Sequence, residues 1–200
     1  MKFNDLRLKV KDSGFFSFAD VFKWFPGSNR QSVKNQLSDW VTKGYLLRLK
    51  RNLYFLCEAE LKEEFILANK LYKPSYVSLE SALNCYGIIP DVPFAVTSAT
   101  IKKTQEFKNQ FGLFLYRTLK PDLFFGWQEI KVGENQFYNI AKPEKAFFDF
   151  LYLNQNSFGK NFPQEERFSL PANFNWQQFK KYTNLIKTKK FKKLVRKVYD

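Results

Sequence analysis

The sequence predicts a two-domain α+β protein, with one domain over residues 1–57 and a second over residues 58–200. In the first domain, helical patterns precede a pair of short strands, whereas in the second, strands and helices are mixed and the chain ends in two basic helices. Hydrophobic residues make up 44% of the chain and include 24 Phe. This is enough apolar material for packed cores, and it excludes global disorder.

Two helices are expected in the first part of the N-terminal domain. The apolar positions of residues 3–11 fit either a helix or a strand, and we expect a helix. Ser17 and Asp20 have the spacing of a capping box and predict a second helix that begins at Phe18. Pro26-Gly27 ends this helix.

A longer helix and a hairpin complete the first domain. Ser28 or Asn29 caps the helix and Gly44 ends it. Its apolar face comprises Val33, Leu37, Trp40 and Val41. The strands Tyr45–Leu49 and Leu53–Leu56 follow, with Tyr45, Leu47 and Leu49 alternating with Leu46 and Arg48 as in a half-buried strand.

The second domain is predicted to be a mixture of both element types. Ser78, with Ser81 nearby, is expected to cap a short helix that Gly87 closes. The other expected elements, in chain order, are a helix over residues 58–73, a strand over 93–97, a helical or irregular segment over 101–110, a strand over 113–118, a hairpin over 125–140, a helix over 142–153, an irregular segment over 154–174, and helices over 176–186 and 190–199.

The positive charge is concentrated at the two ends of the chain. The formal net charge is +14, of which residues 1–57 contribute +7, residues 58–174 contribute −1 and residues 175–200 contribute +8. A polyanion is the natural partner for such ends, because phosphate neutralisation releases condensed counterions.

The order of elements in residues 1–57 is that of a winged helix-turn-helix, whose longer helix enters the major groove of DNA. No carboxylate occurs from Ser28 to Ser38. We therefore expect binding to double-stranded DNA, although winged helices also serve as protein–protein modules. Bidentate contacts of Arg30, Gln31 and Asn35 to bases would each contribute about 1–3 kcal/mol of discrimination. The candidate contacts are Ser28, Asn29, Arg30, Gln31, Ser32, Lys34 and Asn35 on the helix and Arg48, Lys50 and Arg51 on the wing.

Three segments between residues 15 and 155 resemble the AbiE-type antitoxins. Residues 44–54, GYLLRLKRNLY, are similar to the G-x-L-x-R-x-x-x-G-x-Y hairpin of that family, with Asn52 in place of its second Gly. Residues 76–87, YVSLESALNCYG, are similar to its Y-[IV]-S-x-x-S-A-L-x-x-x-G segment, with Glu80 where relatives often have His. Residues 141–149, AKPEKAFFD, are similar to its A-x-P-E-K-A-hydrophobic-x-D segment.

This resemblance implies an antitoxin of a type IV toxin–antitoxin system. Such a protein represses its own operon by binding promoter repeats through its winged helix. Its C-terminal domain, here residues 58–200, counteracts a nucleotidyltransferase toxin encoded next door without a stable complex. The sequence leaves open whether the chain is a monomer or a dimer.

Two groups of charged residues are candidates for an antitoxin or partner surface. In the first group, Lys145 and Asp149 either form an i,i+4 ion pair worth about a few tenths of a kcal/mol or join Glu144 in a polar site that faces a partner. The second group lies on a cationic C-terminal helix with an apolar stripe of Phe191, Leu194, Val195 and Tyr199. Its candidate contacts to DNA, RNA or an acidic toxin are Lys190, Lys193, Arg196 and Lys197.

Two other functions stay open. One is a stand-alone winged-helix regulator whose second domain senses a ligand. The other is a metal-dependent nucleic-acid-processing enzyme that uses Asp122, Glu129 and Lys131, which have the letters of a PD-(D/E)xK nuclease. The spacing of these three residues is short, and Glu129 and Lys131 lie on one face of a strand, so a structural role is favoured.

The remaining residue types exclude several classes of site. The chain has no histidine, which removes Ser-His-Asp and Cys-His catalysis and His-ligated zinc. Cys57 and Cys85 lack metal-ligand spacing, fit a reducing cytosol and are expected to be buried. There is no Gly-rich phosphate loop, no run of about 18 apolar residues and no signal-peptide pattern. We expect a cytoplasmic protein that is not an enzyme and has no metal, cofactor or membrane partner.

Overall fold

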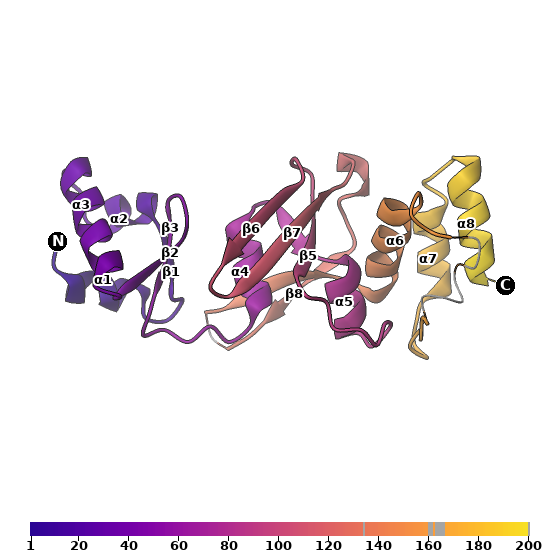
Figure 1. Ribbon diagram of the computed structural model, residues 1–200, viewed down its shortest axis with the longest axis horizontal. Coiled ribbons are helices and arrows are strands. Elements are labelled where there is room, and N and C mark those ends of the chain that lie inside the picture. The colour runs from indigo at the N-terminus through magenta and orange to yellow at the C-terminus, as the bar shows by residue number, and fades with distance from the viewer. Residues whose placement is uncertain (134, 160–161, 163–166, 200) are drawn as a thin grey trace. The chain divides into compact units, whose positions relative to one another are not determined.

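The computed structural model describes residues 1–133, 135–159, 162 and 167–199, and it is a mixed α+β structure with two β-sheets. The chain divides into two compact units (Figure 1). Unit 1 comprises Met1–Leu67 and Lys131–Phe137, and unit 2 comprises Ala68–Ile130 and Tyr138–Asp200.

Among its described residues, unit 1 contains three complete helices and a three-stranded antiparallel sheet with the order β1-β3-β2. The elements are α1 (Phe3–Val10), β1 (Phe15–Ser17), α2 (Phe18–Trp24), α3 (Arg30–Thr42), β2 (Leu46–Lys50) and β3 (Leu53–Leu56). The helices and the sheet share one apolar core, which contains Leu6, Val10, Phe16, Val21, Val33, Leu37, Trp40, Leu46, Tyr54 and Leu56.

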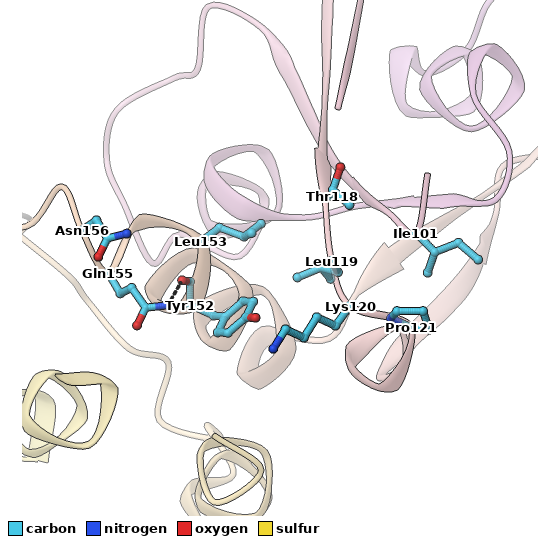
Figure 2. A pocket seen from close by; sticks show the side chains of 9 residues that line it. All are labelled: Ile101, Thr118, Leu119, Lys120, Pro121, Tyr152, Leu153, Gln155 and Asn156. Atoms are coloured by element: carbon cyan, nitrogen blue, oxygen red, sulfur yellow. Dashed lines mark hydrogen bonds between the residues drawn. The ribbon is translucent and has the colours of Figure 1, made fainter. Parts of the chain in front are cut away.

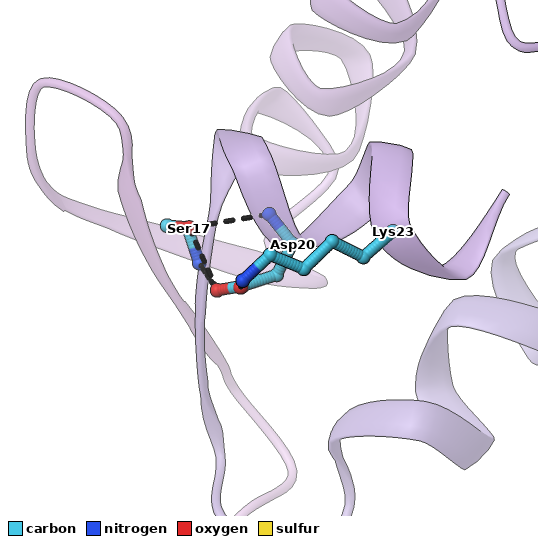
Figure 3. Close-up of polar contacts among 3 residues, drawn as sticks. All are labelled: Ser17, Asp20 and Lys23. Carbon is cyan, nitrogen blue, oxygen red and sulfur yellow. Dashed lines mark hydrogen bonds and ion pairs between the residues drawn. The ribbon is translucent and has the colours of Figure 1, made fainter. Parts of the chain in front are cut away.

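Local capping interactions set the bounds of α2, as the sequence predicts. The Ser17 hydroxyl accepts a hydrogen bond from the backbone N–H of Asp20 at 3.2 Å, and Asp20 Oδ2 accepts one from the Ser17 N–H at 2.8 Å (Figure 3). Burial alone would raise the pKa of Asp20, but the hydrogen bonds from Ser17 and the nearby Lys23 ammonium hold it below its ordinary value. The predicted capping box is therefore confirmed.

The ends of α3 also follow the sequence prediction. The side chain of Asn29 is the N-cap, with its Oδ1 accepting hydrogen bonds from the N–H groups of Gln31 and Ser32. Gly44 lies just beyond the C-cap with a φ of +73°, a left-handed conformation that glycine adopts without steric cost.

Two features of the small sheet differ from the prediction. Strand β1 was not expected. The buried positions of β2 also differ from the predicted alternation, because Leu46 and Leu49 are buried whereas Tyr45 is exposed. The register shifts between Arg48 and Lys50, so the regular alternation of the strand is interrupted at Leu49.

Unit 2 is built around a six-stranded mixed sheet with the order β6-β7-β5-β4-β9-β8. Helix α4 (Glu64–Leu71) crosses the division between the two units. The other elements are β4 (Ser75–Val77), α5 (Leu79–Cys85), β5 (Val96–Thr100), β6 (Gln105–Asn109), β7 (Gly112–Thr118), the 3₁₀ turn η1 (Pro121–Leu123), β8 (Trp127–Lys131), β9 (Phe137–Ala141), α6 (Pro143–Asn154), α7 (Trp176–Thr183) and α8 (Lys189–Tyr199).

Helices cover both faces of this sheet. On one face, the Tyr116 hydroxyl donates a hydrogen bond to the backbone oxygen of Ala68 in α4 at 2.5 Å. On the opposite face, Tyr76 contacts α6 through Asp149, and α7 and α8 pack against α6 in turn (Figure 1). The core of unit 2 therefore lies between the sheet and these helices.

Several expectations for the second half require correction. The helix expected over residues 58–73 begins only at Glu64, and the strand expected over 93–97 lies at Val96–Thr100. Residues 105–109 form strand β6 instead of a helical or irregular segment, and β4 was not expected. Cys57 and Cys85 are exposed and not buried.

Candidate nucleic-acid interface

The candidate base-reading residues lie on the first turns of α3. Arg30, Gln31, Lys34 and Asn35 are exposed there, as is Ser32, while Ser28 is half-buried just before the helix. Their positions follow from the burial of Val33, Leu37 and Trp40 in the core, which turns the polar side of the helix outward.

A groove of about 680 Å³ lies along this polar side of α3 and the β2–β3 hairpin. It is lined by Phe18, Asn29, Arg30, Gln31, Lys34, Ser38, Val41, Arg48, Arg51, Asn52 and Tyr54, all of which are described residues. Four of these side chains are cationic and none carries a carboxylate. We call this feature the unit 1 groove.

The unit 1 groove brings together six of the ten residues predicted to contact DNA, namely Asn29, Arg30, Gln31, Lys34, Arg48 and Arg51. Ser28, Ser32, Asn35 and Lys50 do not line it. The nearest acidic residue on α3, Asp39, forms an ion pair with Lys43 at 2.8 Å in the last turn of the helix. The electrostatic field in the groove is therefore set by four cations at close range.

Contacts within the groove restrict how its polar groups are presented. The Arg30 guanidinium lies over the Phe18 ring, 5.4 Å from its centroid, in a cation–π contact. Gln31 Nε2 donates a hydrogen bond to Asn35 Oδ1 at 2.8 Å, which directs Gln31 Oε1 and Asn35 Nδ2 toward other partners. Asn29 Oδ1 is engaged in capping α3. Phe18 was missed by the sequence analysis, although it directly follows the capping residue Ser17.

The hairpin turn carries the second set of cations. Arg48 is exposed on β2, and Arg51 is exposed in the turn. Asn52 has a φ of +64°, the left-handed conformation that asparagine tolerates better than most residues. The backbone oxygen of Asn52 accepts a hydrogen bond from the Phe18 N–H at 3.1 Å, which joins the hairpin turn to the start of α2.

The first group of expected partner-surface residues is buried in unit 2. Lys145 and Asp149 have exposed fractions of 0% and Glu144 of 8%, so these residues belong to the interior and not to a surface. Lys145 Nζ forms an ion pair with Asp149 Oδ1. The Tyr76 and Ser78 hydroxyls each donate a hydrogen bond to Asp149 Oδ2 at 2.9 Å. Ser78 is the N-cap residue of α5, as predicted, but its side chain makes no capping hydrogen bond because its hydroxyl is bound to Asp149.

Aromatic rings enclose the ammonium group of this buried pair. Lys145 Nζ lies 5.0 to 5.5 Å from the ring centroids of Phe125, Phe148 and Tyr76. Burial lowers the pKa of Lys145 and raises the pKa of Asp149, while the attraction between the two groups opposes both shifts. The Tyr76 and Ser78 partners were missed by the sequence analysis. No spacing in the sequence indicates this contact, because Tyr76 and Asp149 are 73 positions apart.

Glu144 has a structural contact of its own. Its Oε1 accepts a hydrogen bond from the backbone N–H of Asn175 at 2.7 Å. Asn175 in turn caps α7 through its side chain, which accepts a hydrogen bond from Gln178 N at 2.9 Å. Glu144 therefore ties the start of α6 to the start of α7.

The second group of expected partner-surface residues lies on α8. Phe191 and Val195 are buried, and Phe191 packs edge-to-face on Phe148 of α6. Lys190, Lys193 and Arg196 are exposed, whereas Lys197 is half-buried and donates a hydrogen bond to the Phe162 backbone oxygen at 3.4 Å. The packing of α8 leaves a cationic face outward.

The three residues that match the PD-(D/E)xK nuclease pattern are exposed. Asp122 lies in η1, and Glu129 and Lys131 lie on β8. Within the described ranges, no group of three His, Cys, Asp or Glu side chains is placed to hold a metal ion. In the same ranges, no helix combines the length and the apolar character needed to cross a membrane.

Comparison with known proteins gives no assignment: no family model and no curated protein matches the chain.

Proposed function

We propose that unit 1 is a winged helix-turn-helix that binds double-stranded DNA and that the protein is a transcriptional autorepressor. The observation that carries this proposal is the unit 1 groove, in which Arg30 and Lys34 from α3 face Arg48 and Arg51 from the hairpin with no carboxylate among the lining residues. A duplex presents paired rows of phosphates beside base edges, and this combination matches cations that flank a polar helix face.

The contacts in the groove suggest distinct roles for its arginines. Arg30 lies over the Phe18 ring, a contact that restricts its side chain, and we assign to its guanidinium a bidentate contact with guanine. Arg48 and Arg51 belong to the hairpin, where a guanidinium contacts the phosphate backbone or the minor groove. Gln31 Oε1 and Asn35 Nδ2 supply an acceptor and a donor beside Arg30.

Binding of fluorescent duplexes, measured by anisotropy, tests this division of roles. Arg30→Ala should weaken binding to the chain's own upstream region by about 1–3 kcal/mol and relax the preference at one base pair. Arg51→Ala should weaken binding to specific and random duplexes alike and reduce the salt slope by about 0.9, the value of one phosphate contact.

Lys9→Ala, which removes an exposed charge on α1, is the matched control and should change neither quantity. Equal losses on specific and random DNA for Arg30→Ala would contradict the assignment of α3 as the reading helix. Absence of any binding in dilute buffer would refute the DNA-binding function itself.

We propose further that the protein is a cytoplasmic type IV antitoxin that counteracts a nucleotidyltransferase toxin. The support for this part is the resemblance of the three segments between residues 15 and 155 to AbiE-type antitoxins. Co-expression with a nucleotidyltransferase encoded beside the gene should restore growth that the toxin alone arrests. Growth arrest that continues although this protein is abundant and soluble in the cells would refute the proposed antitoxin function.

A further inference from the structure

Unit 2 contains a shallow pocket of about 480 Å³ that the proposed DNA contacts do not use. It lies between the end of β7 with the following turn and the last turn of α6 (Figure 2). Its lining is Ile101, Thr118, Leu119, Lys120, Pro121, Tyr152, Leu153, Gln155 and Asn156. Apolar groups therefore stand next to an aromatic ring, two amides and a cation in one pocket.

The polar groups of the pocket have defined orientations. Gln155 Nε2 donates a hydrogen bond to the Tyr152 backbone oxygen at 2.9 Å, which leaves the Gln155 carbonyl oxygen to accept from a ligand (Figure 2). Asn156 Oδ1 accepts a hydrogen bond from Lys190 Nζ at 2.5 Å. Lys190 on α8 therefore lies at the pocket edge, and its ammonium adds to that of Lys120.

The pocket edge continues into the cationic face of α8. Phe191 packs edge-to-face on Tyr152 with the ring centroids 6.1 Å apart, so the start of α8 is fixed against a residue that lines the pocket. Lys189, Lys192 and Lys193 are exposed around Phe191. The lining of the pocket includes no Asp or Glu among the described residues. The field therefore favours an anionic ligand, and the apolar side chains, the Tyr152 ring and the two amides favour one that carries a flat ring with a polar edge.

We propose that this pocket binds a nucleoside phosphate. The base packs against Tyr152 and the apolar side chains, the Gln155 and Asn156 amides meet its polar edge, and Lys120 and Lys190 neutralise the phosphate. The volume is within the range of roughly 300–1,000 Å³ typical of small-molecule sites. The same chemistry is offered by a free nucleotide and by one unit of a single-stranded nucleic acid, whose further phosphates would follow α8.

Two probes distinguish these sources, and both are measured on the full chain carrying Arg30→Ala and Arg51→Ala to weaken the unit 1 groove. One probe is a labelled single-stranded oligodeoxynucleotide of about 12 nucleotides, and the other is ATP with a fluorescent ribose substituent. Lys120→Ala should weaken binding of whichever probe the parent protein binds by about tenfold. If that probe is the oligonucleotide, the salt slope should also fall by about 0.7. Ile101→Glu, which places a carboxylate at a partly exposed lining position, should weaken binding at least as much.

Charge-matched controls lie at the far end of the β6–β7 hairpin. Lys108 and Gln110 are exposed there, and Lys108 pairs with Leu113, five residues along β7 from Thr118. Lys108→Ala and Gln110→Glu should leave binding unchanged. Binding of ATP identifies a free nucleotide as the ligand, and binding of the oligonucleotide alone identifies a strand. Binding of neither probe at low salt, or equal losses in the control variants, would overturn the proposal.

Discussion

At the scale of single residues, Lys145 and Asp149 show how burial changes the meaning of a sequence pattern. An i,i+4 Lys–Asp pair on an exposed helix contributes only about a few tenths of a kcal/mol. Both side chains here have exposed fractions of 0%, and Asp149 accepts two further hydrogen bonds from Tyr76 and Ser78. Removal of one partner therefore leaves an uncompensated buried charge, which is a far larger effect than the loss of an exposed pair.

We predict that Asp149→Leu lowers the free energy of unfolding by about 3–5 kcal/mol, because it strands the Lys145 ammonium among aromatic rings. The double variant Lys145→Met/Asp149→Leu should recover only part of this loss, because it removes the stranded charge but leaves the Tyr76 and Ser78 hydroxyls without their acceptor. Urea unfolding followed by fluorescence and circular dichroism measures both values. Asp39→Ala, which removes the exposed i,i+4 pair with Lys43, is the control and should have little effect. A similar small effect of Asp149→Leu would contradict the prediction.

The residues of the candidate interface were predictable only in part. Arg30, Arg48 and Arg51 follow from the element order, because a helix and the hairpin after it place their polar sides together. The Phe18 ring beneath Arg30 depends on how the chain turns between α2 and α3, which no spacing in the sequence encodes. The Tyr76 contact to Asp149 likewise joins residues 73 positions apart.

At the scale of elements, local chemistry explains which ones were predicted. Helices α2 and α3 begin at side-chain caps, and α6 begins at Pro143. The start of each helix therefore depends on a few adjacent residues and can be predicted from the sequence. Strands β1 and β4 have only three residues each, too few to show a period. The exposed strand β6 lacks apolar alternation and is held by pairing with β7, a contact that sequence patterns do not reveal.

The capping box of α2 gives a prediction with a defined pH dependence. The pKa of Asp20 is lower in the folded protein than in the unfolded chain, so its contribution to stability is present above the unfolded value of about 3.9 and is lost as the pH falls through the folded value. Asp20→Ala should therefore lower the melting temperature at pH 7, with a cost of about 1 kcal/mol, and the difference from the parent protein should shrink below about pH 4.

Thermal unfolding between pH 3 and pH 7, values that bracket the reference pKa of about 3.9, measures this difference. Asp12→Ala removes an exposed carboxylate from the turn after α1 and is the matched control. A difference for Asp20→Ala that stays constant down to pH 3 would show that the carboxylate does not act through its charged form.

At the scale of the whole molecule, the two basic ends of the chain belong to different units. Residues 1–57, with a net charge of +7, form most of unit 1, whereas residues 175–200, with +8, lie in unit 2. Each end therefore has its own candidate anion-binding surface, the unit 1 groove in one case and the pocket beside α8 in the other. The proposed DNA-binding and antitoxin functions can accordingly be tested on separate parts of the chain.

We predict that a fragment of residues 58–200 relieves toxicity in the co-expression assay and does not retard the upstream DNA. The fragment keeps the hydrogen bond from Gln136 Nε2 to the Glu60 backbone oxygen at 3.1 Å, together with the whole six-stranded sheet. It lacks all of the groove residues. Failure of a folded fragment, verified by circular dichroism, to relieve toxicity would refute the division of functions.

The two exposed cysteines have a practical consequence. Cys57 belongs to unit 1 and Cys85 to unit 2, so the natural chain already offers one attachment point for a fluorophore on each unit. Partial burial raises the pKa of the Cys57 thiol, and a mildly alkaline buffer would therefore speed its reaction with a maleimide dye. A donor and acceptor attached at these thiols would report ligand-induced motion as a change in energy transfer, without any engineered cysteine.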